Sequence, residues 1–212
     1  MVSSESNSVA TLFGPPIQLQ TYKNLLYLLL AVPLGFLYAF VLTFGLVLGL
    51  LLFVVGIGIV ILVATLFGLR AVAGFERALA NVLLGVDLSA YDDISRPDGR
   101  FAGLRSYLDA ASTWRAVGFV QLKFLIGVVG FLVVFAFVSA VQLLAAPIRY
   151  PTSVEFGELN DDPVVWSIDS LPEALGALAV GLIALIVVLH VANAVAYVAE
   201  RMAEALLGEP SS

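Results

Sequence analysis

Three groups of polar residues have types and spacings that could carry chemistry. The first group lies inside long apolar stretches: His190 is the only histidine, Asn193 follows it at i+3 on the same helical face, and Gln142 stands in an earlier stretch. Polar groups inside a membrane span usually face the bundle interior. His190 could therefore sense protons near neutral pH, although an interhelical hydrogen bond is the commoner role for such a side chain.

The second group is acidic and lies at residues 149–172, between two apolar stretches. Carboxylate oxygens at these spacings could bind a hard divalent cation. The segment lacks the glycine-bearing pattern of a calcium loop, so we expect no metal and no cofactor. We interpret it as a solvated acidic loop on which an external stimulus would act. Its acidic side chains are Glu155, Glu158, Asp161, Asp162 and Asp169.

The third group is basic and lies in the polar segment 70–118. Arg70, Arg77 and Asn81 fall on one helical face while apolar residues recur on another, and Arg105 lies in a second amphipathic stretch. These residues could form a docking surface for a partner protein. They could equally belong to two interfacial helices that rest on anionic lipid, and the sequence leaves both interpretations open.

Several classes of function are excluded or disfavoured by what the sequence lacks. The chain has no cysteine, which excludes disulfides, thiolate metal sites and cysteine nucleophiles. It carries no phosphate-binding loop, nucleophile motif or paired catalytic carboxylates, so we expect no enzymatic activity. A net charge of −6 argues against nucleic acid binding, which needs a clustered basic face. Acidity with arginine preferred to lysine suggests either a salt-adapted, haloarchaeal-like composition or a GC-rich organism.

The elements that position these residues must lie in a membrane. Hydrophobic residues make up 61% of the chain and charged residues 12%, against about 25% charged in soluble domains. The charge-free run from Leu25 to Leu69 is too long for one crossing of a roughly 30 Å hydrocarbon core, so we expect it to turn back near Thr43–Gly45. The class is all-α and polytopic. We expect four transmembrane helices at about 24–44, 47–67, 119–147 and 174–199.

The basic residues predict the orientation. Seven of the ten lie between the charge-free run that ends at Leu69 and the next one, which begins at Phe124, and only Arg149 lies between the third and fourth spans. The positive-inside rule then places 70–118 and both termini in the cytoplasm of a cell-membrane protein, and 149–172 outside. Lys123 is expected to extend towards the inner headgroups. The membrane domain covers 21–208, between a tail at 1–20 and another at 209–212.

The same helical hairpin is predicted twice. Thr21-Tyr22-Lys23 opens the first span and Thr113-Trp114-Arg115 opens the third, and Gly35 matches Gly127 at the same offset of 92 residues. Both hairpins end in a Glu-Arg pair followed by Leu-Leu-Gly. Two hairpins of the same direction would be parallel repeats about an axis along the membrane normal.

Short motifs along most of the chain resemble the Putative sensor domain family. They are Val32-Pro33-Leu34-Gly35, Arg70 with Glu76-Arg77, Leu83-Leu84-Gly85-Val86, Trp114-Arg115 and Ala146-Pro147-Ile148-Arg149-Tyr150. The resemblance covers about residues 20–205. It implies a four-helix membrane module of the kind that often precedes a histidine kinase. No kinase follows Gly208 here, so we expect a stand-alone module whose output is a partner protein.

Three functions remain open on the sequence alone. The leading interpretation is a signal-input module that acts in the lipid bilayer through a cytoplasmic or membrane signalling partner. The second is a small transporter or channel subunit, which would act as a homo-oligomer and is disfavoured by the scarcity of charges within the predicted spans. The third is a structural subunit of a membrane complex.

Overall fold

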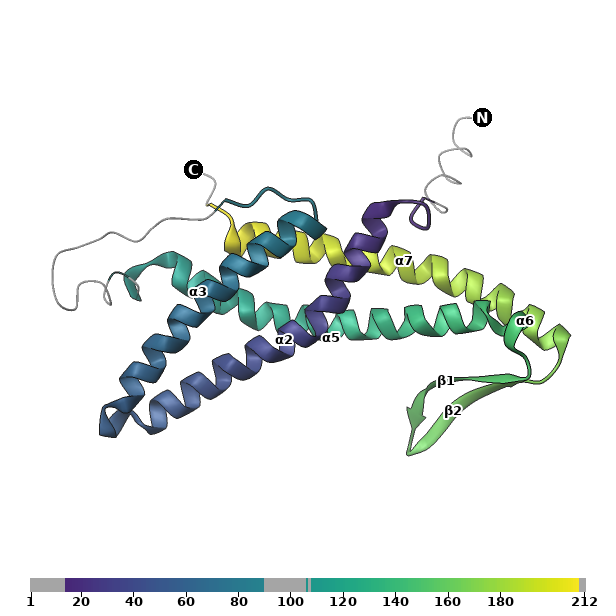
Figure 1. The fold of residues 1–212 in the computed structure, drawn as a ribbon, viewed down its shortest axis with the longest axis horizontal. Coiled ribbons are helices and arrows are strands. Elements are labelled where there is room, and N and C mark those ends of the chain that lie inside the picture. The colour runs from purple at the N-terminus through teal and green to yellow at the C-terminus, as the bar shows by residue number, and fades with distance from the viewer. Residues whose placement is uncertain (1–13, 90–105, 107, 210–212) are drawn as a thin grey trace. The chain divides into compact units, whose positions relative to one another are not determined.

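The computed structural model describes residues 14–89, 106 and 108–209. Four of its helices are long and apolar enough to cross a membrane: α2 (Leu19–Leu51), α3 (Ile57–Leu83), α5 (Ala111–Leu144) and α7 (Leu171–Leu207). Figure 1 shows them with one small β-hairpin. The all-α, four-helix class is confirmed, and the chain is a membrane protein. Because each helix exceeds the roughly 20 residues that one crossing needs, its ends must leave the hydrocarbon core or the helix must tilt.

The turn between the first two spans lies later than the sequence predicted. Helix α2 runs through Thr43–Gly45 to Leu51, and the chain reverses in the 3-10 turn η1 (Phe53–Val55) and at Gly56, whose φ is +79°. A left-handed φ suits glycine. Gly45 instead stays helical and packs closely against Thr65 of α3. The predicted second span at 47–67 was therefore wrong at its start, and helix α3 extends beyond the predicted end of the span to Leu83.

The predicted outer loop is a β-hairpin. Strand β1 (Thr152–Leu159) pairs antiparallel with β2 (Asp162–Ile168), and the short helix α6 (Ala146–Arg149) precedes it. Asn160 and Asp161 connect the strands with φ values of 54° and 66°. Two consecutive positive φ angles define the type I′ turn, which matches the twist of a two-residue hairpin. The hairpin was not predicted from the sequence because a single pair of short strands gives a weak periodic signal.

The chain divides into two compact units, which we describe separately. Unit 1 lies within Met1–Leu25 and Phe131–Ala194. Its apolar core joins the end of α5, α6, the hairpin and the start of α7, with Trp166 packed against it. The buried residues of this core are Leu143, Ala146, Val154, Ile168, Ala174 and Ala177. The hairpin is thus anchored to two membrane helices by buried side chains.

Unit 2 lies within Leu26–Gly130 and Val195–Ser212, and its core includes Tyr38, Leu42, Leu69 and Val120. Its α2 and α5 segments cross at glycines. A Cβ on Gly35 would stand 2.9 Å from the Lys123 carbonyl oxygen, and a Cβ on Gly127 would stand 2.6 Å from the Ala31 carbonyl oxygen. Small residues of this kind let membrane helices approach closely.

The crossing contacts are reciprocal at the offset of the predicted repeat. Gly35 and Gly127 differ by 92 residues, and so do their contact residues Ala31 and Lys123. Two equivalent helices that cross about a local two-fold axis would make this pair of contacts. The duplication itself stays a prediction.

The crossing predicts that Gly35→Ala destabilises the protein. The added methyl group would collide with backbone rather than with a flexible side chain, and overpacking of this kind costs about 1–3 kcal/mol. The measurement is the free energy of unfolding in mixed detergent micelles. Gly68→Ala is the matched control, because a Cβ on Gly68 meets nothing within 4 Å. Equal stability of the two variants would contradict the close crossing.

Candidate functional site

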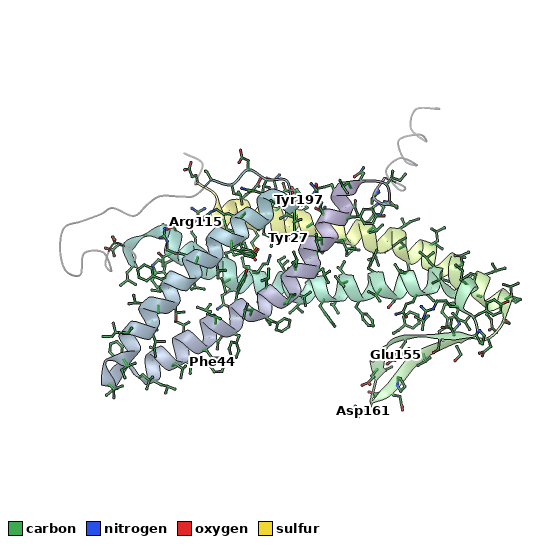
Figure 2. All side chains as sticks on the ribbon, viewed as in Figure 1. Tyr27, Phe44, Arg115, Glu155, Asp161 and Tyr197 are labelled. Atoms are coloured by element: carbon green, nitrogen blue, oxygen red, sulfur yellow. The ribbon has the colours of Figure 1, made fainter. Side chains whose placement is uncertain are left out.

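A buried ion pair joins two helices of unit 2. The Lys123 Nζ of α5 lies 2.8 Å from the Glu76 Oε2 of α3, and both side chains have 0% exposure. Lys123 also lies over the ring of Tyr27 from α2, with Nζ 3.9 Å from the ring centroid; Figure 2 labels Tyr27 on its helix. Three helices therefore converge on one ammonium group, which we call the Lys123 cluster (Tyr27, Glu76 and Lys123).

The expectation that Lys123 extends to the inner headgroups was wrong. Lys123 lies about three turns into α5, and Gly35 brings the α2 backbone against its carbonyl oxygen. The α2 helix therefore covers this part of α5, and the ammonium group turns to the nearest carboxylate instead of to water. A buried charge needs such a partner, because leaving water unpaired costs several kcal/mol per ion.

Two polar atoms of the Lys123 cluster have no hydrogen-bond partner among the described residues. They are the Tyr27 hydroxyl oxygen and the Glu76 Oε1. Buried polar atoms are satisfied in the great majority of cases, and an orphaned one costs about 1–3 kcal/mol. The cluster therefore combines a compensated charge pair with two polar atoms that lack a close partner among the described residues.

The predicted docking residues use part of their polar groups inside unit 2. Arg70 donates to the hydroxyl oxygens of Ser112 at 2.7 Å and Thr113 at 3.2 Å, which ties α3 to the start of α5. The Asn81 side chain donates to the Leu88 carbonyl and accepts from its N–H, closing the end of α3. Arg77 is partly exposed on α3, while Arg105 lies outside the described residues. Docking by this face stays a prediction.

Arg115 makes a further link that sequence reasoning did not identify. Its Nη2 donates to the carbonyl oxygens of Ala205 at 2.6 Å and Gly208 at 2.8 Å. The last carbonyls of a helix have no intrahelical partner, and a cation there interacts favourably with the helix dipole. Arg115 thus caps the C-terminal end of α7 from the start of α5.

The predicted intramembrane polar residues have separate environments. Asn193 of α7 accepts from the Asn24 side chain at 2.9 Å and donates to the Thr21 hydroxyl at 3.0 Å, joining α7 to the first turns of α2 within unit 1. His190 Nδ1 lies 2.8 Å from the Ile186 carbonyl oxygen of its own helix. Gln142 instead lines a pocket beside the hairpin. His190 and Asn193 share a helix, whereas Gln142 belongs to different surroundings.

The predicted acidic residues follow the hairpin. Glu155 and Glu158 lie on β1, Asp161 is in the turn, and Asp162 begins β2. Figure 2 shows Glu155 along the strand and Asp161 at the tip. The N–H of Asp169 donates to the Glu173 carboxylate, which also accepts from the Ser170 N–H and so caps α7. Among the described residues, no three or more ligating side chains are placed to hold a metal ion.

A polar pocket of about 360 Å³ lies between the end of α5 and strand β1 in unit 1. Its lining includes a guanidinium group, a carboxylate, an amide and two hydroxyl groups, beside the buried Val154. The lining residues are Gln142, Arg149, Thr152, Ser153, Val154 and Glu155. This is a concave site of opposite charges at one end of the helices.

The family to which the chain belongs is shown by a match to one family profile. The sequence profile described as "Putative sensor" matches residues 27–207, which include all four long helices almost completely. The chain belongs to this sensor family. Its Lys123 cluster, the hairpin and the polar pocket all fall within the matched range. Neither a curated protein nor a solved structure matches the chain.

Sequence reasoning missed the Lys123 cluster, although a signal was present. Lys123 is a lone charge between Leu122 and Phe124, and Glu76 is the only acidic residue between Leu25 and Val86. Isolated charges in membrane helices usually face the bundle and find a partner. The predicted second span ended at residue 67, before Glu76, so no pairing of Glu76 with Lys123 was predicted.

The Lys123 cluster predicts different effects for two substitutions of Tyr27. Tyr27→Phe keeps the ring under the ammonium group and removes the orphaned hydroxyl, so stability should stay unchanged or rise by up to about 1–3 kcal/mol. Tyr27→Leu loses the ring, and with it a contact of roughly 0.5–2 kcal/mol. The check is thermal unfolding of the purified protein in detergent. Equal losses in the two variants would show that the hydroxyl has a partner.

Proposed function

We propose that this protein is a signal-input module of the cell membrane that acts through a partner protein. Membership of the sensor family and the four apolar helices support the first part of the proposal. The distribution of basic residues supports cytoplasmic termini and an external hairpin, because six of the ten lie in the segment 70–118. The proposal assigns the output to a partner protein at the cytoplasmic face.

The observation that carries the proposal is the anchoring of the hairpin. Val154 of β1 and Ile168 of β2 are buried with Leu143 of α5 and with Ala174 and Ala177 of α7. Because packed cores shift between discrete arrangements rather than deform continuously, a ligand that moves the hairpin must also move the ends of these helices. The hairpin therefore has the construction of an input element.

The receiving end is the set of bonds that α5 makes in unit 2. Helix α5 contributes residues to both units, so it is a continuous covalent link from the hairpin core to Lys123. In unit 2, Lys123 holds Glu76 of α3, and Arg115 holds the last carbonyls of α7. A displacement of α5 would first change the lengths of the hydrogen bonds that Lys123 and Arg115 make. The basic segment beginning at Arg70 would present the change to a partner.

The transporter alternative gains one observation. Glu76 and Lys123 are buried charges within two helices that are long and apolar enough to cross a membrane. Charged groups at such positions often mark a transport path. These two groups, however, neutralise each other at 2.8 Å and neither is exposed, which is the arrangement of an interhelical bond. The third alternative, a structural subunit, would require that the protein does not respond to a stimulus.

The proposal predicts a specific partner in the native membrane. The intact protein is captured after brief cross-linking and mild detergent extraction, and the captured proteins are identified by mass spectrometry. We expect one signalling protein at a ratio fixed to the bait, reduced several-fold by Arg77→Gln, which removes a partly exposed charge from the docking face. Arg201→Gln is the matched control, since Arg201 is paired with Glu204 on the last turns of α7. Recovery of the bait alone would overturn the proposal.

A further inference from the structure

The polar pocket between the end of α5 and strand β1 has the composition of a ligand site. Five of its six lining residues are polar, and among the described residues none of these five side chains forms a hydrogen bond or an ion pair within the chain. They are Gln142, Arg149, Thr152, Ser153 and Glu155. We propose that this pocket binds a small zwitterionic group, with its anionic part on Arg149 and its ammonium part on Glu155. This inference rests on the proposed function, because it names the ligand class of the same input element.

Arg149 supplies the site for the anionic part. It is the last residue of α6 and the single basic residue in the otherwise acidic segment 149–172. A guanidinium group presents a planar fork of donors that suits carboxylate and phosphate oxygens. The acidic residues around it repel free anions of high charge, so an anion that enters with its own positive charge is favoured.

Glu155 supplies the site for the ammonium part. The pairing of β1 with β2 is regular from Thr152 to Glu155 and shifts register between Glu155 and Glu158, where Gly157 has a φ of +107°. Bulges of this kind re-aim side chains and are frequent beside binding sites. The irregularity begins directly after the residue whose carboxylate lines the pocket.

The neutral groups and the volume limit the size of the ligand. Gln142, Thr152 and Ser153 offer one amide and two hydroxyl groups, each of which can donate and accept. A volume of about 360 Å³ is at the small end of the range for ligand pockets. A cation alone would meet Arg149, and an anion alone would meet Glu155, so a ligand that carries both charges fits the lining best.

Two sources could supply this chemistry. A free zwitterion could enter from the external medium, because Arg149, Ser153 and Glu155 are exposed. A zwitterionic lipid headgroup could enter from the membrane, because Gln142 belongs to α5, a helix able to span it. Both present a phosphate or carboxylate a short distance from an ammonium group, and the experiment separates them.

The test uses the full-length protein in nanodiscs of phosphatidylglycerol, which lacks an ammonium group. Glycerophosphoethanolamine is titrated as the soluble probe by calorimetry, and phosphatidylethanolamine is added as the lipid probe and detected as a retained adduct by native mass spectrometry. We expect at least one probe to bind. Arg149→Gln and Glu155→Gln should each weaken that binding roughly tenfold or more, and circular dichroism should show unchanged helix content, because both residues are exposed.

Matched variants decide whether the pocket is responsible. Glu158→Gln changes an exposed carboxylate on the same strand outside the pocket, and Arg201→Gln changes an exposed arginine elsewhere, so both should bind like the parent protein. Binding of the soluble probe assigns the site to a free ligand, and binding of the lipid alone assigns it to a headgroup. The proposal is overturned if neither probe binds, if Glu155→Gln and Glu158→Gln behave alike, or if inorganic phosphate binds as tightly.

A separate measurement keeps this inference distinct from the proposed function. The chain has no cysteine, so Ser167→Cys on the exposed side of β2 gives a single label site for a membrane-impermeant maleimide. Labelling in intact cells together with failure of both probes removes only the ligand class. Labelling that requires permeabilised cells removes the external placement of the hairpin, whatever the probes show.

Discussion

The arrangement of unit 2 depends on one buried charge pair. Lys123 and Glu76 are both fully buried, and neither could remain so alone, because the cost of removing an unpaired ion from water is several kcal/mol. The pair therefore requires α3 and α5 to stay close enough for the two side chains to remain hydrogen-bonded. Gly35 and Gly127 make this possible by letting α2 lie directly on α5 and exclude water from the ammonium group.

Unit 1 organises its polar groups differently. Its apolar core of small and branched residues anchors the hairpin, while the charged groups Arg149 and Glu155 line an open pocket rather than bond to each other. The protein thus neutralises its charges internally at the Lys123 cluster and leaves them available at the hairpin. Helix α5 carries both Gln142 of the pocket and Lys123 of the cluster.

The sequence predicted the features that follow from composition and missed those that follow from packing. Charge-free runs long enough for one or two membrane crossings were enough to predict four helices. The turn at Gly56 was missed because Gly45 is equally suited to end a helix, and only its contact with Thr65 shows why it does not. The prediction for Lys123 was wrong because it considered only the distance of Lys123 from the start of α5. The close approach of α2 at Gly35 buries the lysine side chain instead. The pocket was beyond reach, since Gln142 and Glu155 meet only after the hairpin folds back.

The most direct test of this account is a double-mutant cycle on Glu76 and Lys123, measured as the free energy of unfolding in detergent. Glu76→Gln and Lys123→Met each leave one charge buried without its partner, so each should cost about 3–5 kcal/mol. The double variant leaves no charge, so its loss should be well below the sum of the two and close to that of one single variant or smaller. Additive losses, or single variants as stable as the parent protein, would contradict the account, because the two charges would then not be holding α3 to α5.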